Sequence, residues 1–167
     1  EAYHYFMFSF YTRGMNFVDM MKLKKTDIKN NRIFYTRSKT KGNFSVELND
    51  KANEIINYFK NKVKSDYVFP ILLHNEMTPL QVANRKHKVL ARFNYKLKEI
   101  SKIAEIETHL TSYVARHSFA TIMKNKGVST DIISELMGHS NVQVTMTYLK
   151  EFDNNILDNA VKTLDDI

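Results

Sequence analysis

Residues 108–150 hold the features that most restrict how this chain can fold. Three runs of apolar residues at helical spacing are separated by Gly127 and Gly138, and each glycine stands where a left-handed residue commonly ends a helix. We therefore predict three short helices joined at two glycine corners. Their expected caps or first residues are Ser112, then Ser129 or Thr130, then Ser140 with Gln143 in a capping box.

These predicted helices carry polar groups that core packing does not require. Arg116 and His117 fall in the first two turns of the first helix, and His139 follows the glycine that ends the second. Tyr148 comes nine residues after His139, near the end of the third helix. The two corners would bring an arginine, a histidine and a tyrosine within reach of one another. The side chains expected to face inward from the third helix are Val142, Met146 and Leu149.

At these residues the chain resembles the C-terminal catalytic region of the tyrosine recombinases, also called phage-type integrases. That family has a His-x-x-Arg-His box, a Leu-Gly-His box, and a nucleophilic tyrosine nine residues after the second histidine. The matching residues here are Arg116 with His117, then LMGH at 136–139, then Tyr148, whereas Tyr113 stands in place of the first histidine. Weaker similarity covers nearly the whole chain and resembles integrases of conjugative transposons and other bacterial mobile elements. It implies a tyrosine recombinase catalytic-domain fold and a cytoplasmic, nucleoid-associated protein.

The composition suits a nucleic-acid partner but does not require one. The chain has 25 lysines and arginines against 18 acidic residues, which gives a formal net charge of +7. A polyanion would suit that charge, although basic domains also occur without nucleic acid. The chain has no cysteine, which excludes disulfides and thiolate metal sites and fits a reducing compartment. The sequence has no long apolar run and no signal-like leader, so it does not support a membrane partner.

The rest of the chain predicts a mainly α fold with a small antiparallel β-hairpin or three-stranded sheet, an α+β class. The length is that of about one domain. We therefore predict a single domain over residues 1–167, and the resemblance implies that it is the catalytic domain of a longer integrase, a fragment from which the N-terminal DNA-clamping domain is absent. The expected elements are two helices within 2–25 with a break near Gly14, strands at 32–37 and 44–48 joined by a turn around 41–43, and helices at 51–64 and 80–104.

One position departs from the family pattern in a way that affects the chemistry. The family carries its first catalytic arginine in the segment that matches residues 12–28, and counting back from Leu23 and residues 27–28 places that arginine at Asn16. An amide cannot supply the positive charge that a phosphoryl transition state requires. Arg13 lies one helical turn before Asn16 and is one candidate replacement; a solvated arginine at a helix end is the equally open alternative.

The predicted hairpin offers a second replacement. The family has a β-hairpin here whose lysine reaches into the minor groove and acts as general acid, and the match places that lysine at Lys39. Arg37 lies two residues earlier, so it would share a strand face with Lys39 and is our preferred substitute for the missing arginine. Lys41 is a more natural phosphate contact than an acid. An exposed, charged hairpin with no catalytic role is the competing interpretation.

Further cations lie along the predicted helix at 80–104. Its apolar side would pack inward, and the cationic side could follow a phosphate backbone, although such a run is usually a solvated helix face. Residues 151–167 turn acidic and amphipathic, which argues against DNA contact there. The family often packs this tail on a neighbouring protomer, and packing on its own chain is the equally open alternative. The predicted DNA contacts, with Lys41, are Arg85, Lys86 and Arg92.

The resemblance implies a mechanism without metal or nucleotide cofactor. The Tyr148 oxygen would attack a scissile phosphodiester and form a 3′-phosphotyrosyl intermediate. Arg116 would be the main clamp, His139 would donate a hydrogen bond to a nonbridging oxygen, and Lys39 would protonate the leaving 5′-oxygen. Tyr113 either donates its hydroxyl to the phosphate or simply packs, and His117 is more typical of an internal hydrogen-bonding residue than of a direct participant.

The resemblance implies that double-stranded DNA is the partner and that a homo-oligomer, a tetramer, binds it. Two other functions stay open. One is a helix-turn-helix DNA-binding protein, which would also show short capped helices and a basic surface but would not need Tyr148. The other is a catalytically degenerate recombinase that binds DNA without cleaving it. Asn16 and Tyr113 motivate that second alternative.

Overall fold

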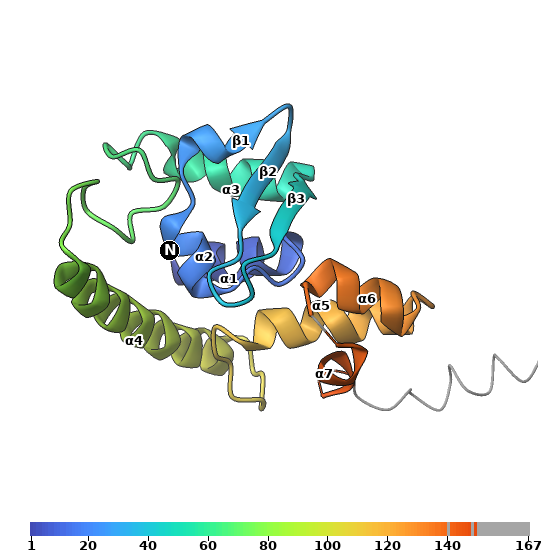
Figure 1. The fold of residues 1–167 in the computed structure, drawn as a ribbon. Coiled ribbons are helices and arrows are strands. Elements are labelled where there is room, and N and C mark those ends of the chain that lie inside the picture. The colour runs from blue at the N-terminus through green and yellow to red at the C-terminus, as the bar shows by residue number, and fades with distance from the viewer. Residues whose placement is uncertain (140, 148, 150–167) are drawn as a thin grey trace, which may run out of the picture. The chain divides into compact units, whose positions relative to one another are not determined.

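The computed structural model describes residues 1–139, 141–147 and 149, and it divides into two compact units, residues 1–119 and 120–167. Within the first unit, two helices precede a small sheet, as expected from the sequence. The order of elements is α1 (Ala2–Tyr11), α2 (Phe17–Lys22), the 3-10 turn η1 (Lys25–Asp27), β1 (Ile28–Lys29), β2 (Arg32–Thr36), β3 (Asn43–Glu47), α3 (Asp50–Lys60), α4 (Pro79–Ile103) and α5 (Val114–Asn125), the last of which ends in the second unit (Figure 1).

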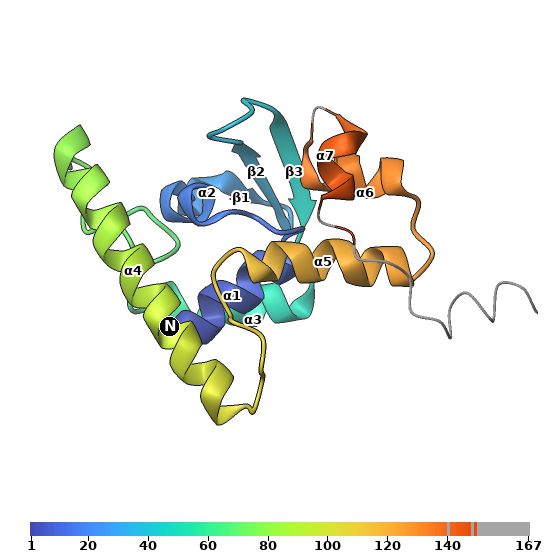
Figure 2. The same cartoon turned by 90° about the horizontal axis from the view of Figure 1, so that it is seen from below.

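The core of the first unit is aromatic. Tyr5 and Phe8 of α1 are buried, and their rings contact residues that are far away in the sequence. Tyr5 lies edge-on to Phe69 and Phe93 and stacks on Phe59, with ring centroids 5.6 to 5.7 Å apart. Large aromatic rings bury much apolar area in few residues, so a single helix can join α3, α4 and the segment between them. The contact between α1 and α4 can be followed in Figure 2.

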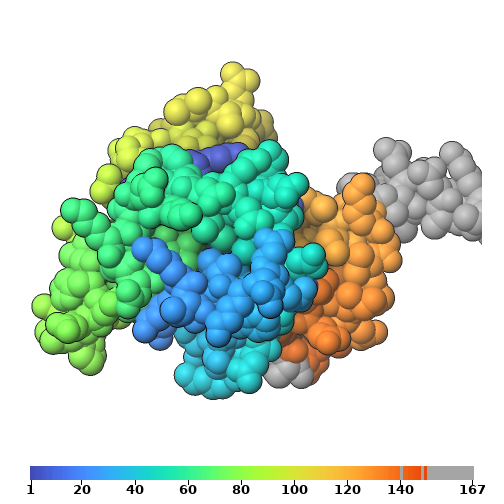
Figure 3. Space-filling view, turned by 90° about the horizontal axis from the view of Figure 1, so that it is seen from above, coloured from blue at the N-terminus to red at the C-terminus, as the bar shows by residue number. Residues whose placement is uncertain are grey.

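The sheet is antiparallel in the order β1-β2-β3. Its two asparagines between β1 and β2 both have positive φ, 49° for Asn30 and 59° for Asn31, as a tight primed turn requires. Ile33 and Val46 are paired across β2 and β3 and are fully buried, whereas Phe34 on the opposite face is exposed. The predicted hairpin is therefore confirmed, with β1 as a short third strand. Figure 3 shows the surface of this part of the chain in blue to teal.

The predicted helices after the sheet are also confirmed. Asn49 caps α3, which ends four residues earlier than the predicted 64. Thr78 and Gln81 form a capping box at the start of the 25-residue helix α4. None of the described helices has an apolar stretch long enough to cross a membrane.

The second unit contains the end of α5 and the helices α6 (Thr130–Met137) and α7 (Val142–Met146). Gly127 and Gly138 have φ of +80° and +66°, so both predicted glycine corners are confirmed. Ser129 caps α6 by accepting a hydrogen bond from the Ile132 amide. Helices α6 and α7 pack on each other.

Two predicted caps are wrong. Helix α5 begins at Val114, so Tyr113 occupies the position before it, and the backbone amide of Ser112 instead donates to Asn94 Oδ1 of α4 at 2.8 Å. Asn141, not Ser140, caps α7, because its side chain accepts from the Gln143 amide; Ser140 itself lies outside the described residues.

The side chains predicted to face inward from α7 also need correction. A helix that starts at Val142 places Thr145 at its buried position, with no exposed area. Met146 falls on the next face and is 49 % exposed. Val142 and Leu149 are half-buried. Thr145, and not its neighbour Met146, is therefore the residue of α7 that faces inward.

Candidate active site

Arg116 is held by the turn that joins α1 to α2. Its side chain is 3 % exposed, and Nη1 donates to the Gly14 carbonyl oxygen at 2.8 Å. Gly14 has φ of +72°, and a Cβ built on it would lie 2.7 Å from Arg116 Cγ, closer than real carbon atoms approach. The absence of a side chain at Gly14 therefore gives Arg116 its place. This contact spans 102 positions of sequence, and the sequence analysis did not predict it.

Asn16, at the position of the family's first arginine, caps α2. Its Oδ1 accepts from the Asp19 amide at 3.0 Å, and its Nδ2 donates to Asp19 Oδ2 at 2.7 Å. We predicted that Arg13 and Asn16 lie in one helix, but the structure shows that they do not. Helix α1 ends at Tyr11, Arg13 has φ of +61°, and Asn16 is extended. The helical-spacing argument for Arg13 is therefore wrong, although the charge of Arg13 still acts on the phenol of Tyr35.

Arg37 follows β2 directly and is 7 % exposed. The alternation of the strand explains this: Ile33 and Tyr35 lie on the inner face, and Arg37 continues their spacing of two. The backbone there turns, since the Arg37 amide donates to the Gly42 carbonyl and the Lys41 amide donates back to the Arg37 carbonyl, both at 2.9 Å. Arg37 is thus a buried cation at the base of the hairpin loop.

Lys39 and Arg37 do not share a strand face. Strand β2 ends at Thr36, so Lys39 lies in the loop and is exposed. Lys41 is also exposed, with φ of +60°. The loop therefore exposes the charges of Lys39 and Lys41 to solvent, while Arg37 at its start is buried. Exposed cations of this kind suit contact with an anionic surface.

The charges of three arginines act on the phenol of Tyr35. The pKa of Tyr35 is raised to about 12, mainly because the ring is buried and then because the Asp19 carboxylate lies near it. The charges of Arg37, Arg116 and Arg13 act in the opposite direction, so all three guanidinium groups lie near enough to influence its hydroxyl. Arg13, Arg37 and Arg116 therefore share one electrostatic environment, that of the Tyr35 phenol, in the first unit.

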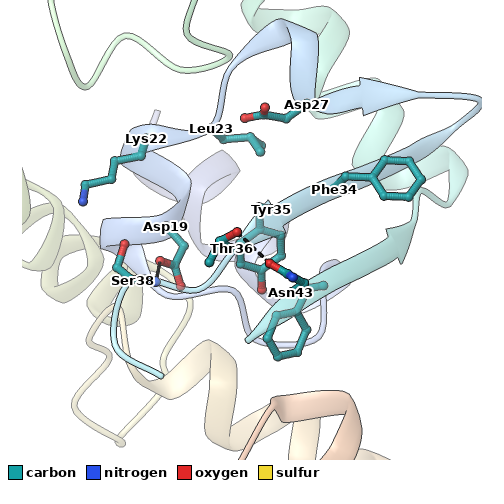
Figure 4. A pocket seen from close by; sticks show the side chains of 10 residues that line it. Asp19, Lys22, Leu23, Asp27, Phe34, Tyr35, Thr36, Ser38 and Asn43 are labelled. Atoms are coloured by element: carbon teal, nitrogen blue, oxygen red, sulfur yellow. Dashed lines mark hydrogen bonds between the residues drawn. The ribbon is translucent and has the colours of Figure 1, made fainter. Parts of the chain in front are cut away.

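A cavity of about 460 Å³ opens beside this cluster, between α2 and the hairpin. Asp19, Tyr35 and Ser38 line it, together with Phe34 and Phe44 (Figure 4). The Tyr35 ring stacks on Phe44, its partner on β3, with ring centroids 5.3 Å apart. Asp19 Oδ1 accepts from the Ser38 amide at 2.8 Å, so one buried carboxylate joins α2 to the loop that carries Lys39.

Sequence reasoning missed Gly14, Asp19 and Tyr35 as site residues. The pattern Asn-x-x-Asp at 16–19 was the available signal for Asp19, because an N-cap asparagine meets the residue three positions later. Tyr35 could have been found from its spacing of two before Arg37. Nothing in the local sequence indicates that Gly14 lies against Arg116.

Tyr113 and His117 form an edge-on ring pair with centroids 5.1 Å apart. Tyr113 is 49 % exposed, and His117 is half-buried.

In the second unit, His139 follows the left-handed Gly138. Its Nδ1 lies 2.8 Å from the buried Thr145 Oγ1, an interaction that fixes the orientation of the ring. The backbone amide of His139 donates to the Ser134 carbonyl at 3.0 Å, as expected after a glycine that ends a helix. Tyr148 lies outside the described residues.

The cations of α4 divide into two kinds. Arg85 is partly committed to the protein itself, since its Nε donates to the Ile71 carbonyl oxygen at 2.8 Å. Lys96 pairs with Glu99 at 2.7 Å. Arg92 is exposed and Lys86 is half-buried. Of the three arginines and lysines of α4 predicted to contact DNA, Arg92 is the most accessible, and Arg85 has a structural role that sequence alone did not reveal.

The model of the phage integrase family matches residues 2–155. The chain belongs to this family. Among curated members, it is 36 % identical over 104 residues to a tyrosine recombinase of Thermosipho africanus, covering 59 % of this chain and 36 % of that protein. It is 28 % identical over 142 residues to the tyrosine recombinase XerD of Staphylococcus haemolyticus, covering 83 % of this chain and 46 % of the relative. The chain thus spans half or less of the length of these relatives.

Solved structures have the same fold as this integrase-family chain. A crystal structure of XerH recombinase bound to a palindromic DNA substrate gives a TM-score of 0.71 at 19 % identity, covering 98 % of this chain and 45 % of that one. The integrase of transposon Tn1549 in complex with transposon right end DNA gives 0.68 at 16 % identity, covering 98 % and 58 %. The predicted tyrosine recombinase catalytic-domain fold is therefore confirmed.

Proposed function

We propose that this chain cleaves and rejoins DNA strands as the catalytic part of a site-specific recombinase. The observation that carries the proposal is a pair of buried arginines: Arg116 and Arg37 are both buried, and their charges act on the Tyr35 phenol, although the family's first arginine is replaced by Asn16. A phosphate that becomes more negative in the transition state is a ligand that would use this charge.

The proposed reaction uses the residues in defined roles. The phenolic oxygen of Tyr148 attacks the phosphorus, its proton passing to solvent, and a 3′-phosphotyrosyl bond forms. The bond to the 5′-oxygen breaks, and Lys39 protonates that oxygen as it leaves. Arg116 and Arg37 stabilise the charge on the nonbridging oxygens, with a hydrogen bond from His139. Reversal with a different 5′-hydroxyl rejoins the strands without an external source of energy.

Double-stranded DNA is the proposed partner, bound by a homo-oligomer, a tetramer, in the bacterial cytoplasm. The exposed loop lysines Lys39 and Lys41 and the accessible Arg92 support backbone contact. Neutralising several phosphates releases counterions, so binding should weaken steeply as salt rises. Substituting Lys41 or Arg92 by alanine should reduce that salt dependence by roughly one ion per cation removed.

Covalent trapping tests the proposed cleavage. The full-length protein that contains this sequence is mixed with a suicide DNA substrate, nicked beside the scissile site so that the cleaved strand diffuses away. We expect a protein–DNA adduct with the parent protein and none with Tyr148→Phe, which should still bind the DNA. Binding without any adduct would overturn the proposal in favour of the degenerate recombinase. Full biological function in Tyr148→Phe would favour the helix-turn-helix alternative.

The same assay assigns the replacement arginine. Arg37→Ala should lower the cleavage rate roughly 100- to 1000-fold, as expected when one preorganised donor to the developing charge is lost. Arg13→Ala should cost much less, because Arg13 lies outside a helix and is only half-buried. Arg37→Lys keeps the charge but not the two-pronged geometry and guards against a folding defect in the alanine variant. Equal tolerance of both alanine changes would remove Arg37 as the substitute.

Lys39 has a separate chemical signature. A substrate with sulfur in place of the leaving 5′-oxygen does not need an acid, because a thiol has a pKa near 8.5 and leaves as the thiolate. Lys39→Ala should therefore be rescued by the sulfur substrate, whereas Arg37→Ala should not. Rescue of both variants, or of neither, would contradict the assignment of Lys39 as the acid.

A further inference from the structure

Asn16 makes two hydrogen bonds to one residue, and only one of them is a helix cap. The Asp19 backbone amide donates to Asn16 Oδ1 at 3.0 Å, and only the oxygen of the Asn16 amide can accept this bond. The nitrogen, Nδ2, is therefore the atom that donates to Asp19 Oδ2 at 2.7 Å. The second bond is short and charge-assisted. The side chain therefore holds both the start of α2 and the carboxylate of Asp19.

Asp19 passes this restraint to the hairpin loop. Its side chain is 4 % exposed, and its other oxygen accepts from the Ser38 amide at 2.8 Å (Figure 4). Ser38 is the residue between Arg37 and Lys39. A buried carboxylate keeps its position only when its oxygens are satisfied, so the Asn16 amide helps to fix the backbone on which both proposed catalytic cations are carried.

Asn49 shows what a capping asparagine does without this extension. It precedes α3 with nearly the same backbone conformation, φ −81° and ψ 170° against −76° and 162° for Asn16. Its Oδ1 accepts from the Ala52 amide at 2.9 Å. The residue three positions on is alanine, which has no carboxylate to hold, whereas at α2 that position is Asp19. The two asparagines are thus matched as caps and differ in the bond to a buried acid.

We propose that Asn16 is a positioning residue: acting through Asp19, it holds Ser38 and so places Arg37 and Lys39 for strand cleavage. This inference rests on the proposed function and deepens it. The asparagine does not replace the charge of the family arginine. It stabilises the loop that supplies the charge from Arg37 instead.

Asn16→Asp separates the cap from the restraint. An aspartate keeps the acceptor that caps α2, but it places a second carboxylate oxygen 2.7 Å from Asp19 Oδ2. Two carboxylates at that distance repel unless they share a proton. We expect cleavage to fall roughly 100-fold near pH 8, the scale of loss when reacting groups are displaced by about 1 Å. As the pH falls toward about 5 and the pair takes up one proton, cleavage relative to the parent protein should recover.

Asn49→Asp and Asn49→Ala are the matched controls, and Asn16→Ala completes the set. All variants are compared at equal folded fraction in the full-length protein, and the exchange rate of the Ser38 amide hydrogen is measured in each. We expect faster Ser38 exchange in both Asn16 variants, and pH recovery in Asn16→Asp alone. Cleavage and exchange that follow only the stability loss, alike at positions 16 and 49, would overturn the inference.

Failure of the proposed function gives a different pattern. If the parent protein forms no covalent adduct, the proposed chemistry is wrong, yet Ser38 exchange in the four variants still reports whether Asn16 holds the loop. If the parent protein cleaves and Asn16→Asp shows neither pH recovery nor faster Ser38 exchange, the chemistry stands and the positioning role is wrong.

Discussion

The two units of this chain differ in the sequence range of the contacts that stabilise each of them. In the first unit, Arg116 reaches back to Gly14 across 102 residues, and Asp19 bonds Ser38 across 19. In the second, His139 meets Thr145 six residues away. The proposed arginine cluster therefore depends on tertiary packing, whereas the surroundings of the histidine follow from helix ends that the local sequence encodes. A backbone change should consequently cost more in the first unit than an equivalent change in the second.

Gly14→Ala should have the largest effect. Both Gly14 and Gly127 have positive φ, so alanine at either position costs about 1–2 kcal/mol in backbone strain. At Gly127 no atom of the residues that the structure describes lies within 4 Å of the added Cβ, whereas at Gly14 the Cβ would meet Arg116 Cγ at 2.7 Å. Displacing that buried side chain should add roughly 1–3 kcal/mol. Urea unfolding followed by far-UV circular dichroism measures both variants.

The same pair of variants also separates stability from chemistry. At equal folded fraction, Gly14→Ala should reduce covalent adduct formation strongly, because Arg116 loses its place, and Gly127→Ala should leave it nearly unchanged. Similar unfolding free energies for the two variants would show that the turn at Gly14 can yield, and the contrast between long-range and local contacts would lose its main support.

The contrast also explains what could be predicted from sequence. Glycine corners, the Ser129 cap and the hairpin are local signals, and the structure confirms each of them. The cradle for Arg116 was not predictable, because it depends on the space at a residue far away in the chain. Arg13 was assigned to a helix that ends before it, since apolar spacing does not show a left-handed residue at a turn.

The family resemblance identified positions better than environments. It placed an arginine site at Asn16, and the structure shows an N-cap there that holds Asp19. It placed the acid at Lys39, and strand spacing then put Arg37 on the same face, but Arg37 is buried and Lys39 is exposed because β2 ends at Thr36, before both residues. Burial and hydrogen-bond partners depend on packing between elements, which a single sequence pattern does not specify.

Thr145→Val tests the local side of the comparison with a smaller effect. Valine has a similar shape and removes the oxygen that lies 2.8 Å from His139 Nδ1. We expect a loss of about 1 kcal/mol in stability, typical of one hydrogen bond, and roughly a tenfold decrease in cleavage as the ring loses a fixed orientation. Nuclear magnetic resonance of the His139 ring nitrogens reports its tautomer.

Thr145→Ser is the matched variant, because it keeps the hydroxyl and loses only a methyl group. Its ring-nitrogen signals should resemble those of the parent protein, with near-normal cleavage. If valine and serine at this position behave alike, the hydroxyl does not orient His139, and the helix end alone must do so.

The smallest effect should come from His4, a long-range contact in the first unit that pH can weaken. The His4 ring of α1 stacks on Tyr58 of α3 with centroids 4.0 Å apart, and Lys62 Nζ lies 3.4 Å from the centre of the Tyr58 ring. Burial lowers the pKa of His4 below its ordinary 6.5, and the N-terminal amino group and Lys62 lower it further. Well above pH 6.5 the histidine is neutral in both folded and unfolded chains and adds no pH dependence. As pH falls below 6.5, the unfolded chain binds a proton first, so stability decreases until the folded pKa is passed.

His4→Phe keeps the stacked ring and should reduce this loss of stability between pH 7.5 and about 5, measured from urea midpoints. Lys62→Gln should reduce the loss partly. Equal pH slopes in the parent protein and His4→Phe would mean that protonation does not weaken the contact between α1 and α3.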